Sequence, residues 1–539
     1  MPARRTVNRC AVCAAWMMAI HLHGTALAAA PEAQPRVRVE TGRLTGAVED
    51  GVESFLGIPY AAPPVGPWRW RPPQPTRPWR GVRSAQAFGN DCMQLRQRPG
   101  NGRANPAEDC LYLNVWRPVA RPAENRLPVL VWIYGGGFVV GGASEPLQDG
   151  ASFARQGLIV VSFNYRLGRF GFFGFPALTH EHPDEPHGNY GFMDQIAALA
   201  WVRRNIADFG GDPGRVTVMG DSAGGESIVA LLAAPPARGL FQRVILQSSG
   251  ARTALAGIRG LGRDLPGLPS AETLGGNFAA SVGIRGEGTA ALKQLRSLPA
   301  AAIAAGVDGT ALRTGSAATT YGGPLLDGRI VTEEPRAAYL AGRTPPVAVL
   351  CGATDADLGK VDAVAKDDLF GHFGARRDAA IAAYDPLGSA PLELLQVEVG
   401  GDQLMVEPAR ELAVAAAARG LSAYEYRFSY VAAAKRETWR RGAPHGSDVP
   451  YAFDTLSRLE WPADPDGEEA ARLLHRYLAQ FALTGDPNVT GLPEWPRYAA
   501  SADVLLEFAP DGRVVAHRDP WRERLDVVRG ARFGVASTR

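Results

Sequence analysis

A serine placed between two glycines is the part of this sequence best suited to chemistry. Ser222 lies in Gly220-Asp221-Ser222-Ala223-Gly224, which follows the apolar run 215–219 and precedes a helix-like segment, 226–234. Between a strand and a helix, this G-x-S-x-G pattern forms a nucleophile elbow, whose glycines let strand and helix pack closely. The pattern also arises by chance in a chain with 62 glycines, so the other groups that a nucleophilic serine needs decide its interpretation.

An attacking serine needs hydrogen-bond donors for the negative charge that develops on the substrate oxygen. The apolar run 127–133 is typical of a buried strand and leads into Gly135-Gly136-Gly137. Three successive glycines leave their backbone N–H groups unshielded by side chains. This segment therefore predicts an oxyanion-hole loop rather than an ordinary flexible glycine loop.

The serine also needs a base, and in this class of site the base follows the acid along the chain. Four histidines come late enough: His372, His445, His475 and His517. His475 falls within the helical pattern 468–483, His517 lies in a polar tail segment, and His372 stands soon after the candidate acid. His445 lies in the loop 442–446 after the strand-like run 423–428, and it is the predicted base.

A carboxylate should orient that base. The apolar run 346–351 leads into a turn that contains two of them, Asp355 and Asp357. In an extended turn, residues two apart point the same way. Spacing alone therefore does not choose between the two carboxylates.

Taken together, these motifs resemble those of the type-B carboxylesterases of the α/β-hydrolase superfamily, which include cholinesterases and bacterial para-nitrobenzyl esterases. Further matches follow in order along the chain: FLGIPYA (55–61), EDCLYLNV (108–115), NYRLG (164–168), FGGDP (209–213) and TGDP (484–487). The resemblance implies an α/β-hydrolase fold with a mostly parallel central sheet, flanking helices and helical cap insertions. The segment 254–323, which lacks sheet motifs, is the expected cap.

The resemblance also assigns roles. It implies a triad of Ser222, His445 and Asp357, with an oxyanion hole formed by the N–H groups of Gly136, Gly137 and Ala223. Ser222 would form an acyl-enzyme with a small-molecule ester, and no metal or organic cofactor is implied. An amidase or a polyester or lactone hydrolase would use the same groups. Some relatives are non-catalytic adhesion modules, but these have lost the nucleophile that this chain keeps.

Two positions depart from the usual pattern of these relatives. Glutamate is usual where Asp357 stands, and aspartate is shorter by about 1.5 Å. Either the backbone approaches His445 more closely, or Asp355 takes the role. Glutamate is also usual where Asp221 precedes the serine, and Asp221 is expected to join a hydrogen-bond network behind the nucleophile.

The first residues are typical of an export signal. Arg4, Arg5 and Arg9 precede a mostly apolar stretch, and small residues favour cleavage after residue 28 or, alternatively, after residue 30. We therefore expect a signal peptide, 1–28, and one carboxylesterase domain, 29–539, in the periplasm or outside the cell. The apolar stretch is too short and too polar for a stable membrane anchor.

The formal net charge and the cysteines bear on the partners and the compartment of this chain. Removal of the signal peptide changes the formal net charge from +2 to −1, so no nucleic-acid partner is implied; the oligomeric state is left undefined. The resemblance implies a disulfide between Cys92 and Cys110, which export would permit, and Cys351 is expected to be a buried thiol. The resemblance also suggests that Glu108 pairs with Arg69.

Overall fold

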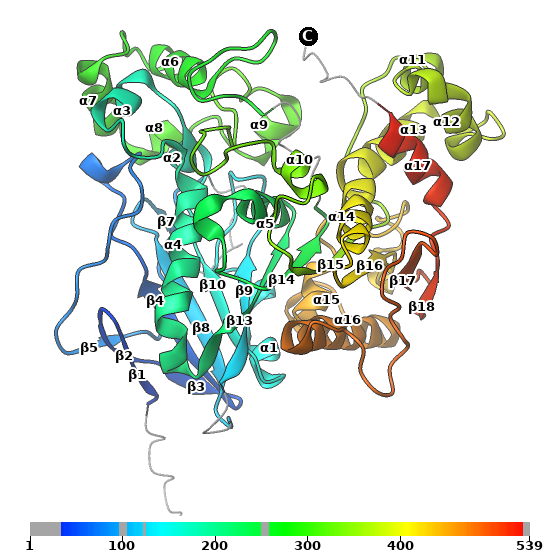
Figure 1. Cartoon of the computed structure of the whole chain (residues 1–539), viewed down its shortest axis with the longest axis horizontal. Helices are drawn as coiled ribbons and strands as arrows, with labels where there is room; N and C mark the ends of the chain where they lie inside the picture. Colours follow the sequence, from blue (N-terminus) through cyan, green and yellow to red (C-terminus); the bar gives the residue numbers. More distant parts are fainter. Residues whose placement is uncertain (1–33, 96–104, 122–125, 250–257, 532–539) are drawn as a thin grey trace, which may run out of the picture. The chain divides into compact units, whose positions relative to one another are not determined.

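Parallel strands form the centre of one large sheet (Figure 1). The computed structural model describes residues 34–95, 105–121, 126–249 and 258–531. In these ranges eleven strands follow the order β18-β17-β16-β15-β14-β13-β9-β10-β8-β4-β3. The seven strands from β17 to β10 pair in parallel, and the strands beyond them at both edges pair antiparallel. This is the predicted, mostly parallel arrangement.

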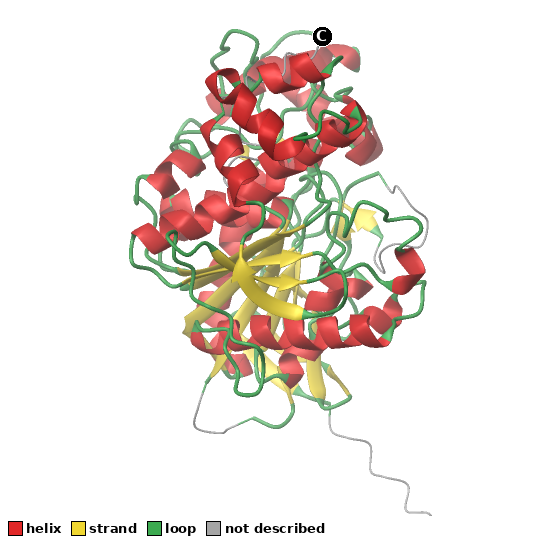
Figure 2. Cartoon of the chain, turned by 90° about the vertical axis from the view of Figure 1, so that its right-hand side faces the viewer, coloured by secondary structure: helices red, strands yellow, loops and turns green. Residues whose placement is uncertain are grey.

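The parallel strands are β10 (Ile159–Phe163), β9 (Leu127–Ile133), β13 (Gly211–Asp221), β14 (Arg243–Gln247), β15 (Ala348–Thr354), β16 (Ala423–Phe428) and β17 (Val504–Phe508). The edge strands are β18 (Val514–Arg518), β8 (Tyr112–Pro118), β4 (Val52–Pro59) and β3 (Ala47–Glu49). Central strands such as β9 are apolar along nearly their whole length because helices cover both faces of the sheet (Figure 2). The strands predicted over 127–133 and 423–428 are confirmed.

Short strands form three smaller sheets: β1 (Arg36–Val39), β2 (Gly42–Thr45) and β5 (Val82–Ser84); β6 (Asp91–Cys92) and β7 (Pro106–Ala107); β11 (Phe172–Phe173) and β12 (Gly188–Asn189). The helices around the main sheet are α1 (Ala151–Arg155), α2 (Gly168–Gly171), α3 (Pro176–Glu181), α4 (Tyr190–Asn205), α5 (Ala223–Ala233), α10 (Pro335–Leu340), α14 (Glu407–Ala418), α15 (Val449–Ala452) and α16 (Pro465–Thr484).

The predicted cap contains helices in the part that the structure describes. It contains α6 (Ala271–Ser281), α7 (Thr289–Ser297), α8 (Ala300–Ala304) and α9 (Gly309–Thr314), which gather above α5 in Figure 1. Arg69 links the cap to the sheet domain. Its guanidinium forms the expected ion pair with Glu108 and also donates hydrogen bonds to carbonyl groups at the end of α7, including that of Arg296 at 2.9 Å.

A second helical insertion was not predicted. Between β15 and β16 lie α11 (Lys366–Gly371), α12 (Arg377–Tyr384) and α13 (Leu392–Gly401), followed by a π-helix, η6 (Asp402–Val406). These helices share a small apolar core with α17 (Arg522–Gly530), near the other end of the chain. No local sequence pattern indicates these helices, because their apolar side chains pack against α17, which is distant in the sequence.

The cysteines follow the expected pattern. Cys92 and Cys110 form a disulfide whose Cα atoms lie 4.9 Å apart. Cys351 is a buried free thiol in β15 whose Sγ donates to the carbonyl of Ala409 at 3.2 Å. Burial raises the pKa of the Cys351 thiol well above its usual range, so this cysteine is unreactive at neutral pH.

The predicted signal peptide, 1–28, lies outside the described residues, as do residues 254–257 of the expected cap. From Pro35 onward the chain forms one compact unit. None of the helices in the described ranges combines the length and apolar character that a membrane crossing requires.

Candidate active site

Ser222 occupies a sharp turn between β13 and α5, as the elbow motif predicts. Its φ of +55° lies in the left-handed region, which is strained for a residue with a side chain. The backbone N–H of Ser222 donates to the carbonyl of Gln247 at the end of β14, 2.9 Å away. A Cβ at Gly224 would lie 2.0 Å from the carbonyl oxygen of Ile133. Only glycine therefore allows α5 to begin so close to β9.

The glycine loop passes directly beside this serine. A Cβ at Gly135 would lie 2.9 Å from the Cβ of Ser222. Gly136 has a φ of +113°, and a Cβ there would lie 2.1 Å from the carbonyl oxygen of Val140. The N–H groups of Gly136, Gly137 and Ala223 donate no hydrogen bond to any other described residue. These three N–H groups belong to the two segments that flank Ser222, the glycine loop and the start of α5.

His445 contacts Asp357. The distance from His445 Nδ1 to Asp357 Oδ1 is 2.5 Å, and the Asp357 side chain is completely buried. Asp357 also accepts hydrogen bonds from the N–H groups of Leu358 (2.7 Å) and Thr354 (3.1 Å). Burial acts to raise the pKa of Asp357, but the charge and hydrogen bond of His445 outweigh it and hold that pKa below its usual value. Asp357 therefore stays ionised in its contact with the imidazole.

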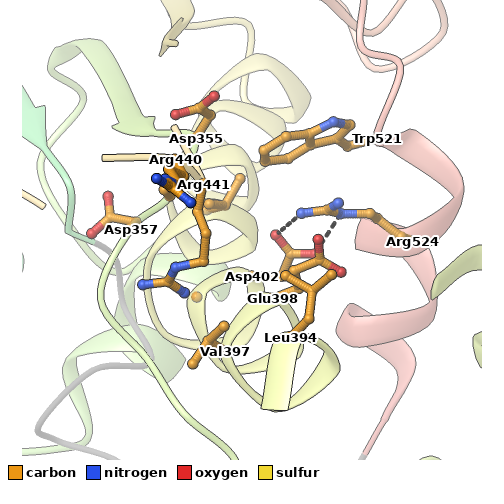
Figure 3. Close-up of a pocket in the computed structure, with 13 residues that line it drawn as sticks. Asp355, Asp357, Leu394, Val397, Glu398, Asp402, Arg440, Arg441, Trp521 and Arg524 are labelled. Carbon is orange, nitrogen blue, oxygen red and sulfur yellow. Dashed lines mark hydrogen bonds and ion pairs between the residues drawn. The ribbon is translucent and has the colours of Figure 1, made fainter. Parts of the chain in front are cut away.

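Asp355 has a different partner, although both carboxylates border the cavity drawn in Figure 3. Its Oδ1 accepts a hydrogen bond from the backbone N–H of Ala443, 2.6 Å away. Burial raises the pKa of Asp355 to about 6. Of the two carboxylates between which spacing could not choose, Asp357 is the one that contacts the histidine.

Two further carboxylates lie near His445. Asp221 accepts no hydrogen bond from another described residue, and its Oδ1 is buried. The expected hydrogen-bond network runs instead through Asp448, a fully buried residue that the sequence analysis missed. Asp448 Oδ2 accepts from Tyr426 at 2.7 Å and from the Gln247 side chain at 3.0 Å. In the sequence, the one indication of a role for Asp448 was its position three residues after His445.

These charges set the protonation of the histidine. Burial acts to lower the pKa of His445, but the carboxylate of Asp357 and the weaker influence of Asp221 and Asp448 raise it to about 9. Asp221 itself has a pKa raised by burial to about 7. No hydrogen bond joins Ser222 to His445, both of which are described. Such contacts are often long without substrate and tighten when it binds.

The other three histidines that were candidates for the base lie elsewhere in the fold. His475 is buried in α16, with Nδ1 2.9 Å from the carbonyl oxygen of Ala452, and His517 on β18 pairs with Glu507. His372 follows the end of α11. Among the described residues, no three His, Cys, Asp or Glu side chains gather as a candidate metal site.

The cap reaches the glycine loop through Leu312 in α9. Its Cδ1 would lie 2.8 Å from a Cβ built on Gly137. Leu312 is 39% exposed, so part of its apolar side chain faces solvent. It therefore forms an apolar wall beside one of the free donors. Sequence reasoning missed this contact because it depends on how the cap folds over the sheet.

A cavity of about 460 Å³ borders the loop that contains Asp355 and Asp357 (Figure 3). Apolar side chains of α13 and the ring of Trp521 line it, together with Arg440 and Arg441 from the segment before His445. Within the lining, Arg524 forms an ion pair with Asp402.

Comparison with known proteins identifies the group to which this arrangement belongs. The carboxylesterase family matches residues 33–378 and 393–523. The fumonisin B1 esterase of Sphingopyxis macrogoltabida is 34% identical over 93% of this chain and 92% of its own length. The para-nitrobenzyl esterase of Bacillus subtilis (strain 168) is 34% identical over 90% of this chain and 97% of its own.

Solved structures agree. A carboxylesterase of Geobacillus stearothermophilus is 33% identical and has a TM-score of 0.75, with 91% of this chain and 99% of that chain covered. A PNB esterase with 30% identity has the same score over 92% of this chain and 100% of its own. Because these similarities extend over most of each chain, this protein belongs to the carboxylesterase family.

Proposed function

We propose that this protein hydrolyses small carboxylic esters by a two-step route with an acyl-enzyme on Ser222. Membership of the carboxylesterase family and its esterase relatives support ester hydrolysis. The observation that favours the serine route is the 2.5 Å contact between His445 and a buried carboxylate at the same edge of the sheet as a strained serine.

In the first step His445 Nε2 takes the proton of Ser222 as the hydroxyl oxygen attacks the ester carbonyl. Asp357 holds the Nδ1 proton, so that Nε2 is the nitrogen left to act as base. The charge that develops on the carbonyl oxygen is held by the free N–H groups of Gly136, Gly137 and Ala223. The alcohol then leaves with the proton that His445 had taken.

In the second step water attacks the acyl-enzyme. His445 removes a proton from the water, and the same three N–H groups hold the second oxyanion. Collapse of this intermediate releases the carboxylic acid and returns the proton to Ser222. Both steps use the protein's own side chains and backbone groups.

We also propose that the chain is exported after removal of residues 1–28, which leaves one domain, 29–539. The disulfide between Cys92 and Cys110 supports an oxidising compartment, since such bonds are rare in the cytosol. The family match begins at residue 33, after the proposed signal peptide.

Purified protein beginning at residue 29 provides the test. It should hydrolyse p-nitrophenyl acetate and butyrate, whereas matched anilides should be much poorer substrates. Ser222→Ala should abolish this activity, and Ser297→Ala, on the exposed side of α7, should leave it within about twofold. Turnover of esters by Ser222→Ala would contradict the serine route. Faster turnover of anilides than of esters would favour an amidase.

A further inference from the structure

We propose that Asp355 and Gly442 form a latch that fixes the position of His445 relative to Asp357. We name residues 354–358 the acid loop and residues 442–446 the histidine loop. The inference rests on the proposed function, because it makes Asp355 a positioning residue for the candidate acid and base. Asp355 acts in it through the backbone of the histidine loop and does not touch the imidazole.

The two loops pair like short parallel strands. Ala356 forms a parallel β-bridge with Pro444, and the Ala356 N–H donates to the carbonyl of Ala443 at 3.1 Å. Asp355 completes the pairing, since its Oδ1 accepts from the Ala443 N–H at 2.6 Å. Both hydrogen-bonding groups of the Ala443 backbone are therefore held by the acid loop.

The register of this pairing leads directly to the candidate acid and base. Asp355 lies two residues before Asp357, and Ala443 lies two residues before His445. The parallel bridge between Ala356 and Pro444 sets Asp355 opposite Ala443 and Asp357 opposite His445. Fixing Asp355 against Ala443 therefore also brings Asp357 against His445.

Gly442 lets the carboxylate reach this position. It has a φ of +127°, and a Cβ there would lie 2.3 Å from Asp355 Oδ1 and 2.6 Å from its Cγ. Any other residue would push the Asp355 carboxylate away from the Ala443 N–H. The glycine and the aspartate are thus matched to each other across the two loops.

The sheet holds the chain just after the histidine loop, where Asp448 accepts from Tyr426 and Gln247, but strand pairing does not extend into the loop itself. Pairing between β15 and β16 ends at Thr354 and Phe428, and the Asp355 N–H still donates to the Phe428 carbonyl at 3.1 Å. After Phe428 the chain leaves the sheet, and its backbone bonds to the acid loop at Ala443. Within the described residues no salt bridge holds the half-buried Asp355 side chain, and its Oδ1 accepts from the Ala443 N–H at 2.6 Å.

The test compares kcat and KM of Asp355→Ala, Asp355→Asn and the parent protein on p-nitrophenyl butyrate, with kcat expressed per titrated serine. Loss of a hydrogen bond to a charged group should lower kcat of Asp355→Ala about 10- to 100-fold with little change in KM. Asp355→Asn keeps an oxygen acceptor and should stay within about tenfold of the parent. The low-field NMR resonance of the His445 Nδ1 proton should be present in Asp355→Asn and lost in Asp355→Ala.

Two double variants separate positioning from a general structural effect. Asp357→Glu should lower kcat in the parent, where the longer carboxylate crowds His445, and should raise kcat in Asp355→Ala, where the histidine loop has moved away. Gly442→Ala should lower kcat in the parent, and by a smaller factor in Asp355→Ala, because the carboxylate that it would meet is gone. Gly442→Ala in the parent displaces the same carboxylate without removing it, so it keeps the test available if Asp355→Ala yields little folded protein.

The latch is overturned if Asp355→Ala keeps kcat within about twofold of the parent, or if Asp357→Glu and Gly442→Ala each have equal effects in both backgrounds. Either outcome leaves the proposed function standing, provided that Ser222→Ala is inactive. Activity in Ser222→Ala would instead overturn the proposed function and the latch together.

Discussion

The two halves of the candidate active site are built differently. The nucleophile half consists of Ser222 and the glycine loop, at the ends of β13 and β9, which are direct neighbours in the sheet. The acid-base half consists of Asp357 and His445, on loops that meet through contacts between loops. The first half is positioned by regular structure, and the second by individual side chains. Substitutions outside the reacting groups should therefore disturb the second half more.

The largest expected effect beyond the serine itself concerns the two carboxylates of the acid loop. Asp357→Asn should lower kcat by ~10⁴, because an amide holds the imidazole in the wrong tautomer. Asp355→Asn is the matched control and should stay within roughly tenfold. Steady-state kinetics with circular dichroism as a folding control measures both. If the two results were reversed, the assignment of Asp357 as the orienting acid would be wrong.

Removing the disulfide tests whether the activity of the nucleophile half depends on contacts outside the sheet. Asp91, next to Cys92, accepts from Ser144 at 2.7 Å just beyond the glycine loop. Replacing both Cys92 and Cys110 with alanine should lower the free energy of unfolding by ~3 kcal/mol, measured by denaturant titration. At a temperature where the variant remains folded, kcat should stay within a fewfold of the parent. A much larger loss of kcat in folded protein would show that this half also depends on contacts outside the sheet.

Leu312 tests whether the cap limits the substrates of the nucleophile half. Leu312→Ala removes an apolar wall beside Gly137, so bulkier esters should gain. The ratio of kcat/KM for p-nitrophenyl hexanoate to that for the acetate should rise about tenfold. Leu340→Ala, an exposed leucine at the end of α10, is the control. An unchanged ratio in Leu312→Ala would exclude this residue as a determinant of chain-length preference.

The smallest expected effect is a shift in pH dependence. His445 acts as a base only after losing its proton, so kcat/KM should rise with pH through the pKa of His445. Asp221 is one of the carboxylates that raise this pKa, together with Asp357 and Asp448. Asp221→Asn removes one negative charge and should move the rising limb to lower pH. Asp511→Asn, on the exposed turn before β18, should not move it. A limb that stays in place in Asp221→Asn would contradict the charge effect.

The same difference explains how much the sequence could predict. The elbow and the glycine loop are contiguous motifs that follow strands, so Ser222 and the free donors of Gly136 and Gly137 could be identified from pattern and resemblance. His445 required the order rule as well. The orienting acid did not follow from spacing, since the pairing of the acid loop with the histidine loop decides which of Asp355 and Asp357 meets His445.

Other features were hidden for related reasons. In the sequence, Asp448 is only a carboxylate three residues after His445. Its hydrogen-bond partners Gln247 and Tyr426 lie on two different strands, so the sequence does not show that they meet. The helices between β15 and β16 bury their apolar side chains against α17, which no local pattern reveals. The expected network around Asp221 was wrong in its members, because the hydrogen bonds converge on Asp448 instead.

The most direct test of the proposed function is covalent labelling of the nucleophile. Treatment of the purified protein with an organophosphate should abolish ester hydrolysis as one adduct forms per chain, and peptide mass mapping should locate the adduct on Ser222. The same treatment of Ser222→Ala should leave that peptide unmodified. Complete inactivation with the adduct on another residue, or unchanged activity of the parent after Ser222 is modified, would contradict the assignment of Ser222 as the nucleophile.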